Sequence, residues 1–575
     1  MKRTAAYLVR YALEQLKITH TFGIPGVHNT EIYDELDKSE LIEPVLVTHE
    51  GYGAFMADAV SRSSNSTGTL VIVPAAGATH AASGIGEASL DGIAMLVISG
   101  GVRSDSQFAY QLHDMDQHAL MKPISKKTYK VTRHDQVVST IFEAYRLAHE
   151  GEPGPVFIEI PVNLQLDKAE VGDLPEFVAP EPALPPDSGE AIARAAKLLA
   201  GAKKPGIFLG WGAADASQYS EKIAELLNAP VATSLQGLSV FSARHPLHTG
   251  MGFGPAAVPA AANAFKNCDC LLAVGTRFAE IATGSFGVTV PENLIHIDIN
   301  PEVFHANYPA KISLAGDATL LLAELAQVLA SQRIQAKITD VAGQIARDKA
   351  AYLKQWLNHD SGDRVNPALF FQQLRAKLKD DAYVIADDGN HTFLTAELMP
   401  CYQVKHFFSP TDFNCMGYAT PAVIGTKLAN PDNQVVGIIG DGAFLMSYTE
   451  LFTAAAREIG AIFTVFSDGE LAQISQAQAT PYNRKTCSRL PDLKIKAMVE
   501  ASGCQYLRIE QNSQVSWGID QALALAGENI PVVLDINIDY SKKTCFTRGI
   551  IKTNLKRMPL PTKARMISRA LWRRV

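Results

Sequence analysis

The sequence predicts an α/β protein made of three doubly wound parallel sheets followed by a basic C-terminal tail. Short apolar runs of strand length alternate with helical patterns along most of the 575 residues, and buried strands separated by helices are typical of parallel sheets. At ~100–200 residues per domain, this length corresponds to about three or four domains. The hydrophobic share of 47% and the charged share of 19% exclude a disordered or fibrous chain.

The strand-like runs are too short to cross a membrane. They include Leu70–Val73, Met95–Ser99, Val156–Ile160, Ile207–Leu209, Leu271–Val274, Leu294–Ile299, Val435–Ile439, Ile462–Phe466 and Val532–Ile538, whereas a membrane-spanning helix needs ~20 apolar residues. Arg10 and Glu14 interrupt the apolar stretch near the N-terminus, so we expect no secretory signal. Seven scattered cysteines favour a reducing compartment, and we expect the protein to be cytoplasmic.

Two stretches divide the chain into domains. Residues 171–188 contain five prolines, which favour an extended chain over regular helix or sheet, so this segment is a predicted linker. The charged stretch 332–364, which precedes a helix start at Asn366 and Pro367, marks a second boundary. The predicted domains are therefore residues 1–170, 189–335 and 366–540, and residues 541–575 form a C-terminal extension.

The C-terminal extension carries a strong positive charge. Residues 541–575 hold eleven basic residues and no acidic one, and because the whole chain has a net charge of −7, residues 1–540 carry −18. Pro561 favours the start of a helix whose apolar face would include Ile567 and Leu571. Such a helix would dock on the acidic body of the protein or lie on an anionic membrane surface. We expect no nucleic-acid partner, because no aromatic platform or known module accompanies the charge.

One strand-like run ends in a glycine-rich turn that suits a phosphate. Val435–Ile439 is followed by Gly440, Asp441, Gly442 and Ala443, and then by a helical pattern from Ser447 to Ile459. Glycines permit a tight turn, and the free N–H groups at the start of a helix attract phosphate. An aspartate in such a turn needs a divalent cation between itself and the phosphate, and Mg²⁺ is the natural candidate.

A second carboxylate follows the next strand-like run. Ala461–Phe466 ends in Ser467, Asp468, Gly469 and Glu470, which places Asp468 at the carboxyl end of a second strand, where open α/β sheets bind their ligands. Two adjacent strand ends would then hold one metal ion and a diphosphate. The alternative is that the glycines form an ordinary turn and that Asp468 caps a helix. The spacing of the two carboxylates favours the metal site over this alternative.

These motifs resemble the thiamine-diphosphate (ThDP) dependent enzymes of the acetohydroxyacid (acetolactate) synthase and pyruvate decarboxylase superfamily. The family signature, Gly-Asp-Gly followed by Asn, matches Gly440, Asp441, Gly442 and Asp468. The resemblance implies that Asp441 and Asp468 bind Mg²⁺ through their side chains and Glu470 through its backbone carbonyl. Because the family usually has Asn at the position of Asp468, the same oxygen ligand here carries an additional negative charge and the metal affinity would differ.

Four further motifs extend the resemblance over about residues 1–540. They are Gly23-Ile24-Pro25-Gly26, His49-Glu50-Gly51, Asp387-Asp388-Gly389-Asn390-His391 and Met416-Gly417-Tyr418, in the family's order. The resemblance implies a pyrimidine-binding N-terminal domain, a central domain and a diphosphate-binding C-terminal domain. The residues that it implies for cofactor binding are Gly26, Glu50, Gly389, Asn390, His391, Met416, Gly440, Asp441, Gly442, Ala443 and Asp468.

The resemblance also implies roles for two side chains. In the family a buried glutamate exchanges a proton with the pyrimidine ring of ThDP, and Glu50 matches its position, so Glu50 is the candidate general acid–base. Burial in an apolar cleft would raise the pKa of this carboxyl. A bulky side chain between the two rings keeps the cofactor bent, and Met416 matches that position.

The central region resembles the domain that holds a non-redox flavin (FAD) in acetohydroxyacid synthases. Gly275-Thr276-Arg277-Phe278 carries the resemblance, with Arg277 at the position of a flavin-binding arginine. Many relatives keep this fold without the flavin. We therefore favour a structural role, with Arg277 paired at a domain interface, over FAD binding.

Three histidines are candidates for proton transfer to or from a substrate. His28 follows the turn at Gly26, His80 stands where the family usually has Asn, and His113 takes the place of a family glutamine. The last departure argues against strict acetolactate synthase activity. The segments around His28 and His113 look closer to 5-guanidino-2-oxopentanoate decarboxylase. A structural role for each histidine is the competing interpretation.

Three functions compete at this point. The first is a ThDP- and Mg²⁺-dependent carboligase, similar to acetolactate synthase, that decarboxylates a 2-oxo acid and transfers the acyl unit to a second carbonyl. The second is a simple 2-oxo acid decarboxylase that releases an aldehyde, and the third is a non-catalytic scaffold with the same fold. The resemblance implies active sites between chains, so we expect a homodimer or a homotetramer.

Overall fold

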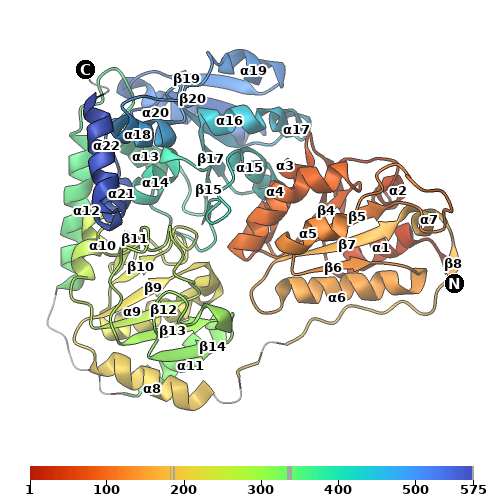
Figure 1. Cartoon of the computed structure of the whole chain (residues 1–575), viewed down its shortest axis with the longest axis horizontal. Coiled ribbons are helices and arrows are strands. Elements are labelled where there is room, and N and C mark those ends of the chain that lie inside the picture. The colour runs from red at the N-terminus through yellow and green to blue at the C-terminus, as the bar shows by residue number, and fades with distance from the viewer. Residues whose placement is uncertain (182, 186–187, 333, 335–339, 573–575) are drawn as a thin grey trace.

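Three six-stranded parallel sheets, each with helices packed on it, make up most of the molecule (Figure 1). The computed structural model describes residues 1–181, 183–185, 188–332, 334 and 340–572. In each sheet the first strand in sequence lies inside the sheet and later strands are added on both of its sides, which is the arrangement of doubly wound sheets. The α/β fold that the sequence predicts is therefore confirmed.

The N-terminal sheet is buried on both faces. Its strands are β2 (His20–Gly23), β3 (Glu43–Leu46), β4 (Gly68–Ile72), β5 (Met95–Gly101), β6 (Lys127–Lys130) and β7 (Pro155–Pro161), in the order β3-β2-β4-β5-β7-β6. Its helices are α1 (Ala5–Gln15), α2 (Thr30–Leu36), α3 (Glu50–Ser63), α4 (Ala76–Asp91), α5 (Gln117–Met121), α6 (Val137–His149) and α7 (Val162–Leu166). Met95 and Val97 of β5 belong to the core cluster of α3 and α4, whereas Leu96 and Ile98 belong to that of α1 and α6. This alternation follows from the two-residue period of a strand. β1 (Lys2–Arg3) pairs antiparallel with β8 (Ala169–Glu170) beside this sheet.

The central sheet repeats the pattern. Its strands are β9 (Pro205–Leu209), β10 (Val231–Thr233), β11 (His248–Met251), β12 (Cys270–Val274), β13 (Leu294–Asp298) and β14 (Ile312–Ala315), in the order β11-β10-β9-β12-β13-β14. The accompanying helices are α8 (Ser188–Gly201), α9 (Ser217–Leu227), α10 (Pro259–Ala264) and α11 (Ala318–Ala330). A long helix, α12 (Val341–Leu357), then runs toward the third sheet.

The C-terminal sheet holds the glycine-rich turns. Its strands are β15 (Tyr383–Ala386), β16 (Phe407–Phe408), β17 (Val435–Gly440), β18 (Ile462–Ser467), β19 (Gln505–Ile509) and β20 (Val532–Asn537), in the order β16-β15-β17-β18-β20-β19. Its helices are α13 (Pro367–Lys377), α14 (Asn390–Leu398), α15 (Ala419–Ala429), α16 (Asp441–Ser447), α17 (Leu451–Ala456), α18 (Ala472–Tyr482), α19 (Ile495–Ala501) and α20 (Val515–Gly527). The helix start predicted at Asn366 and Pro367 is confirmed. The Asn366 side chain caps this helix by accepting the backbone N–H groups of Ala368 and Leu369.

The helix predicted over residues 447–459 is wrong in its limits. The first helix after β17, α16, already begins at Asp441, and a 3₁₀ turn at residues 448–450 separates it from α17. The reason lies in Gly440 and Asp441: Gly440 is the N-cap in extended backbone, and the Asp441 carboxylate accepts the N–H of Gly442 at 2.8 Å. The strand therefore turns into the helix without an intervening loop.

The N-terminal and C-terminal sheets lie side by side through α3 and α15 (Figure 1). Gly425 of α15 permits the close approach, since a Cβ there would lie 2.5 Å from the backbone oxygen of Met56. Across the same boundary the Tyr418 hydroxyl donates to the buried Asp58 carboxylate at 2.5 Å. Asp58 in turn pairs with the buried Arg62 at 2.7 Å. The contact is both close-packed and hydrogen-bonded.

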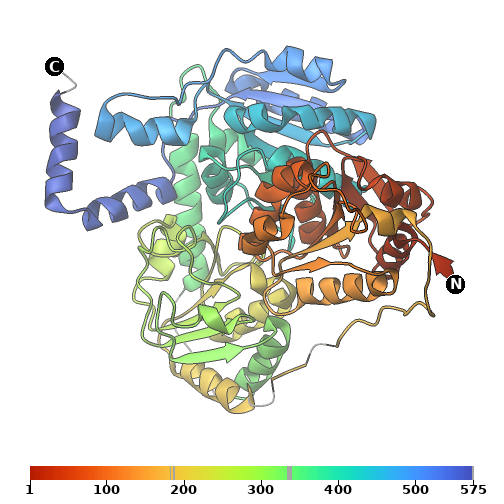
Figure 2. The same cartoon turned by 45° about the vertical axis from the view of Figure 1, so that its right-hand side comes forward.

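The basic extension forms two helices that stand out from the body (Figure 2). They are α21 (Cys545–Arg557) and α22 (Leu560–Trp572), so the helix start predicted near Pro561 is confirmed. Arg557 donates to the backbone oxygens of Ser285 and Phe286, and α22 packs along α18, with the Arg569 guanidinium 5.3 Å from the centre of the Tyr482 ring. Residues 573–575, with two of the basic residues, lie outside the described chain. Among the helices that are described, none combines the length and apolar character needed to span a bilayer.

Candidate active site

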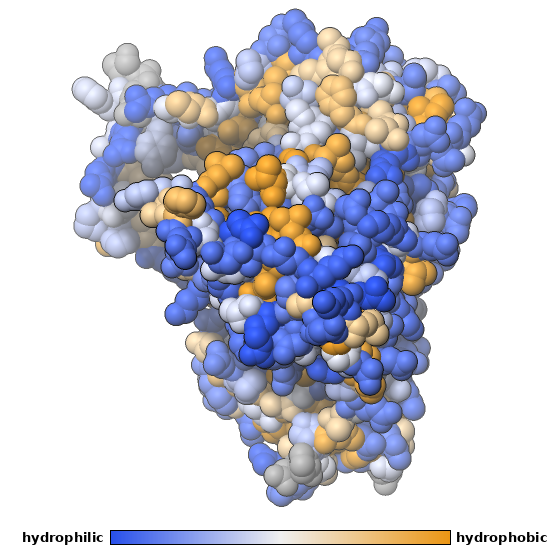
Figure 3. Space-filling view, turned by 90° about the vertical axis from the view of Figure 1, so that its right-hand side faces the viewer, coloured by the Kyte–Doolittle hydropathy of each residue, from blue (hydrophilic) through white to orange (hydrophobic). Residues whose placement is uncertain are grey.

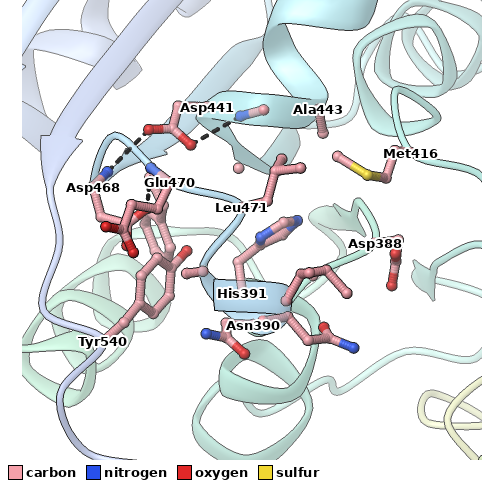
Figure 4. Close-up of a pocket in the computed structure, with 17 residues that line it drawn as sticks. Asp388, Asn390, His391, Met416, Asp441, Ala443, Asp468, Glu470, Leu471 and Tyr540 are labelled. Carbon is pink, nitrogen blue, oxygen red and sulfur yellow. Dashed lines mark hydrogen bonds between the residues drawn. The ribbon is translucent and has the colours of Figure 1, made fainter. Parts of the chain in front are cut away.

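A pocket of about 130 Å³ opens at the carboxyl ends of the C-terminal strands (Figure 4). Its lining residues are Asp388, Gly389, Asn390, His391, Met416, Gly440, Asp441, Gly442, Ala443, Phe466, Asp468, Glu470, Leu471, Ala472, Gln473, Ile474 and Tyr540. Most of them follow β15, β17, β18 and β20, at the edge where open parallel sheets bind ligands. The pocket thus gathers nearly all the residues predicted to bind the cofactor, and the described residues that line it all lie between 388 and 540.

Asp441 joins the ends of two strands. Its Oδ2 accepts the backbone N–H groups of Asp468 at 3.0 Å and Gly469 at 2.7 Å, and its Oδ1 accepts that of Gly442 at 2.8 Å. The residue is only 3% exposed, and burial raises the pKa of its carboxyl. These bonds hold the turn after β18 against the turn after β17, which brings the two predicted metal-binding positions together.

Asp468 and Glu470 differ in what their side chains contact. Burial, followed by the neighbouring Asp441 charge, raises the pKa of Asp468 to about 7, and two close carboxylates favour a proton or a cation between them. The Glu470 carboxylate instead pairs with Lys485 and accepts from the Ser475 hydroxyl at 2.7 Å. Its side chain is thereby occupied, which leaves its backbone carbonyl for the predicted ligation.

Three buried polar atoms in the pocket have no hydrogen-bond partner in the described chain. They are Nε2 of His391, Oε1 of Gln473 and the hydroxyl oxygen of Tyr540. Burial lowers the pKa of His391 to about 3, so its ring is neutral, and burial raises the pKa of Tyr540 well above its ordinary value, so its hydroxyl keeps its proton. Because buried polar groups are normally hydrogen-bonded, these atoms indicate a polar ligand. The sequence motifs gave no signal for Tyr540.

Glycines keep the floor of the pocket open. A Cβ at Gly440 would lie 2.8 Å from the His391 ring, and a Cβ at Gly442 would lie 2.4 Å from the Leu471 side chain. Gly389 has a φ of +151° and its Cβ would lie 2.6 Å from the same His391 ring. Side chains at these positions would fill the space. The open backbone floor, the two carboxylates and the unpaired Tyr540 hydroxyl donor fit a metal-bound diphosphate.

Met416 lies across the pocket from Asp468 (Figure 4), on a segment that buried acids hold in place. Asp387 accepts the N–H of Gly417 at 2.9 Å, and Glu87 of α4 accepts that of Cys415 at 3.0 Å. Burial raises the pKa of Asp387 to about 7 and that of Glu87 to about 8. Sequence reasoning missed both residues as positioning groups, although Asp387 belongs to a motif that it did identify.

A second group of predicted residues lies at the carboxyl ends of the N-terminal strands. Glu50 begins α3 just after β3 and is 5% exposed, and its Oε2 lies 2.9 Å from Nδ1 of His80 on α4. The His49 ring stacks on the His80 ring at 4.6 Å, and burial lowers the pKa of His49. Gly77 leaves room beside the glutamate, since a Cβ there would lie 3.3 Å from Oε1. A carboxyl in contact with an imidazole has the components for proton exchange.

His28 and His113 form a separate pair in the same part of the molecule. Their Nδ1 atoms are 3.2 Å apart, and burial followed by the charge of His113 lowers the pKa of His28. His113 has a φ of +66°, a conformation that residues other than glycine seldom adopt. Gly26 packs close to β4, because a Cβ there would lie 2.6 Å from the Val73 side chain. The four catalytic candidates therefore occur as two pairs, away from the pocket lining.

Arg277 is occupied by groups of this chain. Its guanidinium contacts Asp412 at 2.5 Å and Glu152 at 3.4 Å, and it also donates to the backbone oxygen of Leu90. These partners come from the N-terminal and C-terminal parts of the chain. The pairing at a domain interface that the sequence suggested for Arg277 is present.

Comparison with known proteins agrees with this architecture. Three family models match the chain: "Thiamine pyrophosphate enzyme, N-terminal TPP binding domain" at residues 3–120, the "central domain" of the same enzymes at residues 192–325, and their "C-terminal TPP binding domain" at residues 387–536. Together they cover more than half of the sequence.

Full-length relatives are similar over almost the whole chain. The acetolactate synthase isozyme 3 large subunit of Escherichia coli is 29% identical over 554 residues, which are 94% of this chain and 95% of the relative. The acetolactate synthase large subunit of Corynebacterium glutamicum is 29% identical over 548 residues, 93% and 86% respectively. That of Haemophilus influenzae is 29% identical over 552 residues, 94% and 95% respectively. The chain therefore belongs to the ThDP-dependent enzymes, in their acetolactate synthase-like branch, whose members decarboxylate a 2-oxo acid or transfer its acyl part.

Proposed function

We propose that this enzyme uses ThDP and Mg²⁺ to decarboxylate a 2-oxo acid and to transfer the resulting acyl unit to a second carbonyl compound. The observation that carries the proposal is the pocket in which the buried Asp441 and the half-buried Asp468 face a glycine floor at two adjacent strand ends. ThDP supplies an acidic ring carbon that, when deprotonated, serves as an electron sink for breaking or making a bond next to a carbonyl.

The C-terminal pocket would hold the metal and the diphosphate. Asp441 and Asp468 offer carboxylate oxygens, Glu470 offers its backbone carbonyl, and water and phosphate oxygens complete the six ligands that Mg²⁺ prefers. The Tyr540 hydroxyl and the Nε2 atom of His391, which have no partner within the described chain, would bind polar atoms of the same ligand. Met416 on the facing wall would support the bend of the cofactor.

The N-terminal residues would move protons. Glu50 is our candidate for the group that exchanges a proton with the pyrimidine ring, and its contact with His80 at 2.9 Å gives that proton a second carrier. His28 and His113 are candidates for proton transfer to or from the substrate. Since Arg277 is already paired within the chain, we propose that the reaction proceeds without FAD, and activity of a flavin-free preparation would test this.

We further propose that each active site forms between two copies of the chain. The described residues that line the diphosphate pocket come from the C-terminal part alone, whereas Glu50 and the histidine pairs lie on the N-terminal sheet.

Figure 3, which looks onto the side of the molecule that carries the N-terminal sheet, shows apolar side chains among the polar ones. Phe108, Tyr110 and Leu112, close in sequence to His113, are 84%, 99% and 65% exposed. Exposed apolar side chains next to half of a site indicate a surface that a partner covers, and a symmetric homodimer would complete both sites, alone or within a homotetramer.

Product analysis tests the reaction. The purified protein is incubated with ThDP, Mg²⁺ and a panel of 2-oxo acids that includes pyruvate and 5-guanidino-2-oxopentanoate, and products are identified by mass spectrometry. We expect a coupled hydroxyketone that is lost in Glu50→Gln. The same variant should lose the exchange of the C2 proton of ThDP for deuterium, measured by proton NMR, while it still binds the cofactor.

Subunit mixing tests the shared site. Glu50→Gln and Asp441→Ala each inactivate both sites of a homodimer, but a mixed dimer would hold one intact site and one doubly altered site. Random reassociation after mild dissociation should therefore restore about a quarter of the wild-type activity. If the mixture stays inactive although mixed dimers are detected by native mass spectrometry, the two residues act within one chain.

A simple decarboxylase is the second candidate. The His28–His113 contact at 3.2 Å favours it, because an imidazole near the substrate is suited to protonate an intermediate and so release an aldehyde. An aldehyde as the sole product would establish this activity. Absence of any cofactor-dependent turnover over the panel would favour the non-catalytic scaffold.

A further inference from the structure

A second cavity, of about 210 Å³, lies between the central and C-terminal sheets. Its walls come from β11, α10, α12 and the end of α14, and its lining residues share none with the ThDP pocket. Neither Arg277 nor its neighbours Gly275 and Thr276 line it. The cavity is therefore distinct from the site described above.

One wall carries a cation without a counter-ion. Lys349 of α12 is largely buried, and its only hydrogen bond in the described chain joins Nζ to Nδ1 of His248 on β11 at 3.1 Å. No carboxylate of the described residues lies within ion-pair distance of Nζ. Burial lowers the pKa of this lysine to about 8, so the ammonium form still predominates at neutral pH. A buried cation with no anionic partner is unfavourable unless a ligand supplies one.

His248 adds a second unpaired donor. An ammonium group has only donors, so Nδ1 accepts from Lys349 and the proton of the ring lies on Nε2. The ring is neutral, because burial lowers its pKa well below the ordinary value. Nε2 is buried and has no hydrogen-bond partner among the described residues. The cavity wall thus holds two unsatisfied N–H donors, of which one is charged.

The acidic groups of the cavity are bound elsewhere. Asp348 accepts from Asn263 and Gln344, each at 3.0 Å. Glu397 accepts the Tyr352 hydroxyl at 2.5 Å and the backbone N–H groups of Cys545 and Phe546 at 3.1 and 2.8 Å, which anchors the start of α21. Neither carboxylate is an ion-pair partner of Lys349 in the described chain, so its ammonium group has N–H donors left for an anionic ligand.

The rest of the wall is apolar. Leu238, Met251, Val258, Leu353, Leu398 and Met399 contribute to the lining. The volume is above the ~150 Å³ of an apolar cavity that accommodates benzene, so it suits an aliphatic body of comparable size. A lining of this kind, with a few convergent polar groups, is typical of small-molecule sites.

We propose that this cavity binds a small aliphatic carboxylate, whose carboxylate group accepts from Nζ of Lys349 and whose hydrocarbon part packs against the apolar wall. Because the cavity shares no lining residue with the ThDP pocket, this site is separate from the one that would bind the substrate. The position between α12, α14 and the central sheet places it where two of the sheets meet.

Isovalerate is a suitable probe, since it has no 2-oxo group and so is no substrate of a 2-oxo acid enzyme. Binding to the purified full-length protein without ThDP is measured by isothermal titration calorimetry, with methyl isobutyl ketone as the uncharged probe of the same shape. We expect one isovalerate per chain, at least tenfold weaker binding of the ketone, and at least tenfold weaker isovalerate binding in Lys349→Met, as expected for loss of a charge-assisted hydrogen bond.

Two further variants make the test specific. Lys427→Met removes another lysine whose pKa burial lowers, at the end of α15 and outside the cavity, and should bind isovalerate as the wild type does. Ala260→Leu keeps the charge but fills the cavity from α10, and should abolish binding even if Lys349→Met folds poorly. Undetectable binding of isovalerate, equal binding of the ketone, or unchanged binding in both Lys349→Met and Ala260→Leu would each overturn the proposal. Because no cofactor is present, these outcomes are independent of the catalytic function.

Discussion

Replacing Lys349 by methionine should stabilise the ligand-free protein at neutral pH. Burial lowers the pKa of this lysine from 10.5 to about 8 in the folded chain, so folding favours its neutral form. The protonated form of Lys349 therefore lowers the free energy of unfolding. This loss of stability grows as the pH falls from 10.5 to 8 and is constant below pH 8. At about 1.4 kcal/mol for each pKa unit, it reaches about 3 kcal/mol at pH 7 and about 1.4 kcal/mol at pH 9.5.

Methionine has a similar length and no charge, but it also removes the hydrogen bond to His248, which is worth about 1 kcal/mol. The expected net gain is about 2 kcal/mol at pH 7 and less than about 0.5 kcal/mol at pH 9.5. Urea unfolding followed by tryptophan fluorescence, to which Trp356, fully buried on the same helix α12, contributes, measures the change in stability. His248, Asp348 and Glu397 line the cavity in both proteins, and burial keeps the His248 ring neutral over this pH range. Equal stability of the two proteins at pH 7, or a gain that does not shrink at pH 9.5, would refute the reasoning.

Four further substitutions have defined outcomes. Asp441→Ala should abolish Mg²⁺-dependent ThDP binding in calorimetry. Asp468→Asn keeps an oxygen ligand and should retain this binding with a changed Mg²⁺ requirement. A similar loss of ThDP binding in both variants would contradict the ligand assignment. Tyr418→Phe leaves the buried Asp58 carboxylate without its donor at 2.5 Å, so the free energy of unfolding should fall by about 1–3 kcal/mol; an unchanged midpoint would show that the bond contributes little. Tyr540→Phe removes a hydroxyl with no partner in the described chain, so the unfolding midpoint should stay the same while the Kd for ThDP with Mg²⁺ rises about fivefold. An unchanged Kd would exclude Tyr540 from the site.

The strands and their functional ends were accessible from local sequence patterns. The central strands β4, β5, β7, β9, β12, β13, β17, β18 and β20 coincide within about two residues with the predicted apolar runs, because strands buried on both faces need continuous apolar side chains. The edge strands β3, β6 and β16 are short or polar and were not predicted. Glycine turns directly after two apolar runs were sufficient to place Asp441 and Asp468 at neighbouring strand ends, since parallel strands present their carboxyl ends at one edge.

The sequence by itself therefore determined the α/β fold, the family motifs and most of the lining of the C-terminal pocket, since each depends on residues that are close in the chain. Only the tertiary structure decided which distant side chains meet. It paired Glu50 with His80, brought Tyr540 to Asp468, and placed Lys349 beside His248 with 100 residues between them in the chain. Such contacts depend on how helices pack between sheets, and neither the period of a strand nor the chemistry of a turn encodes that packing.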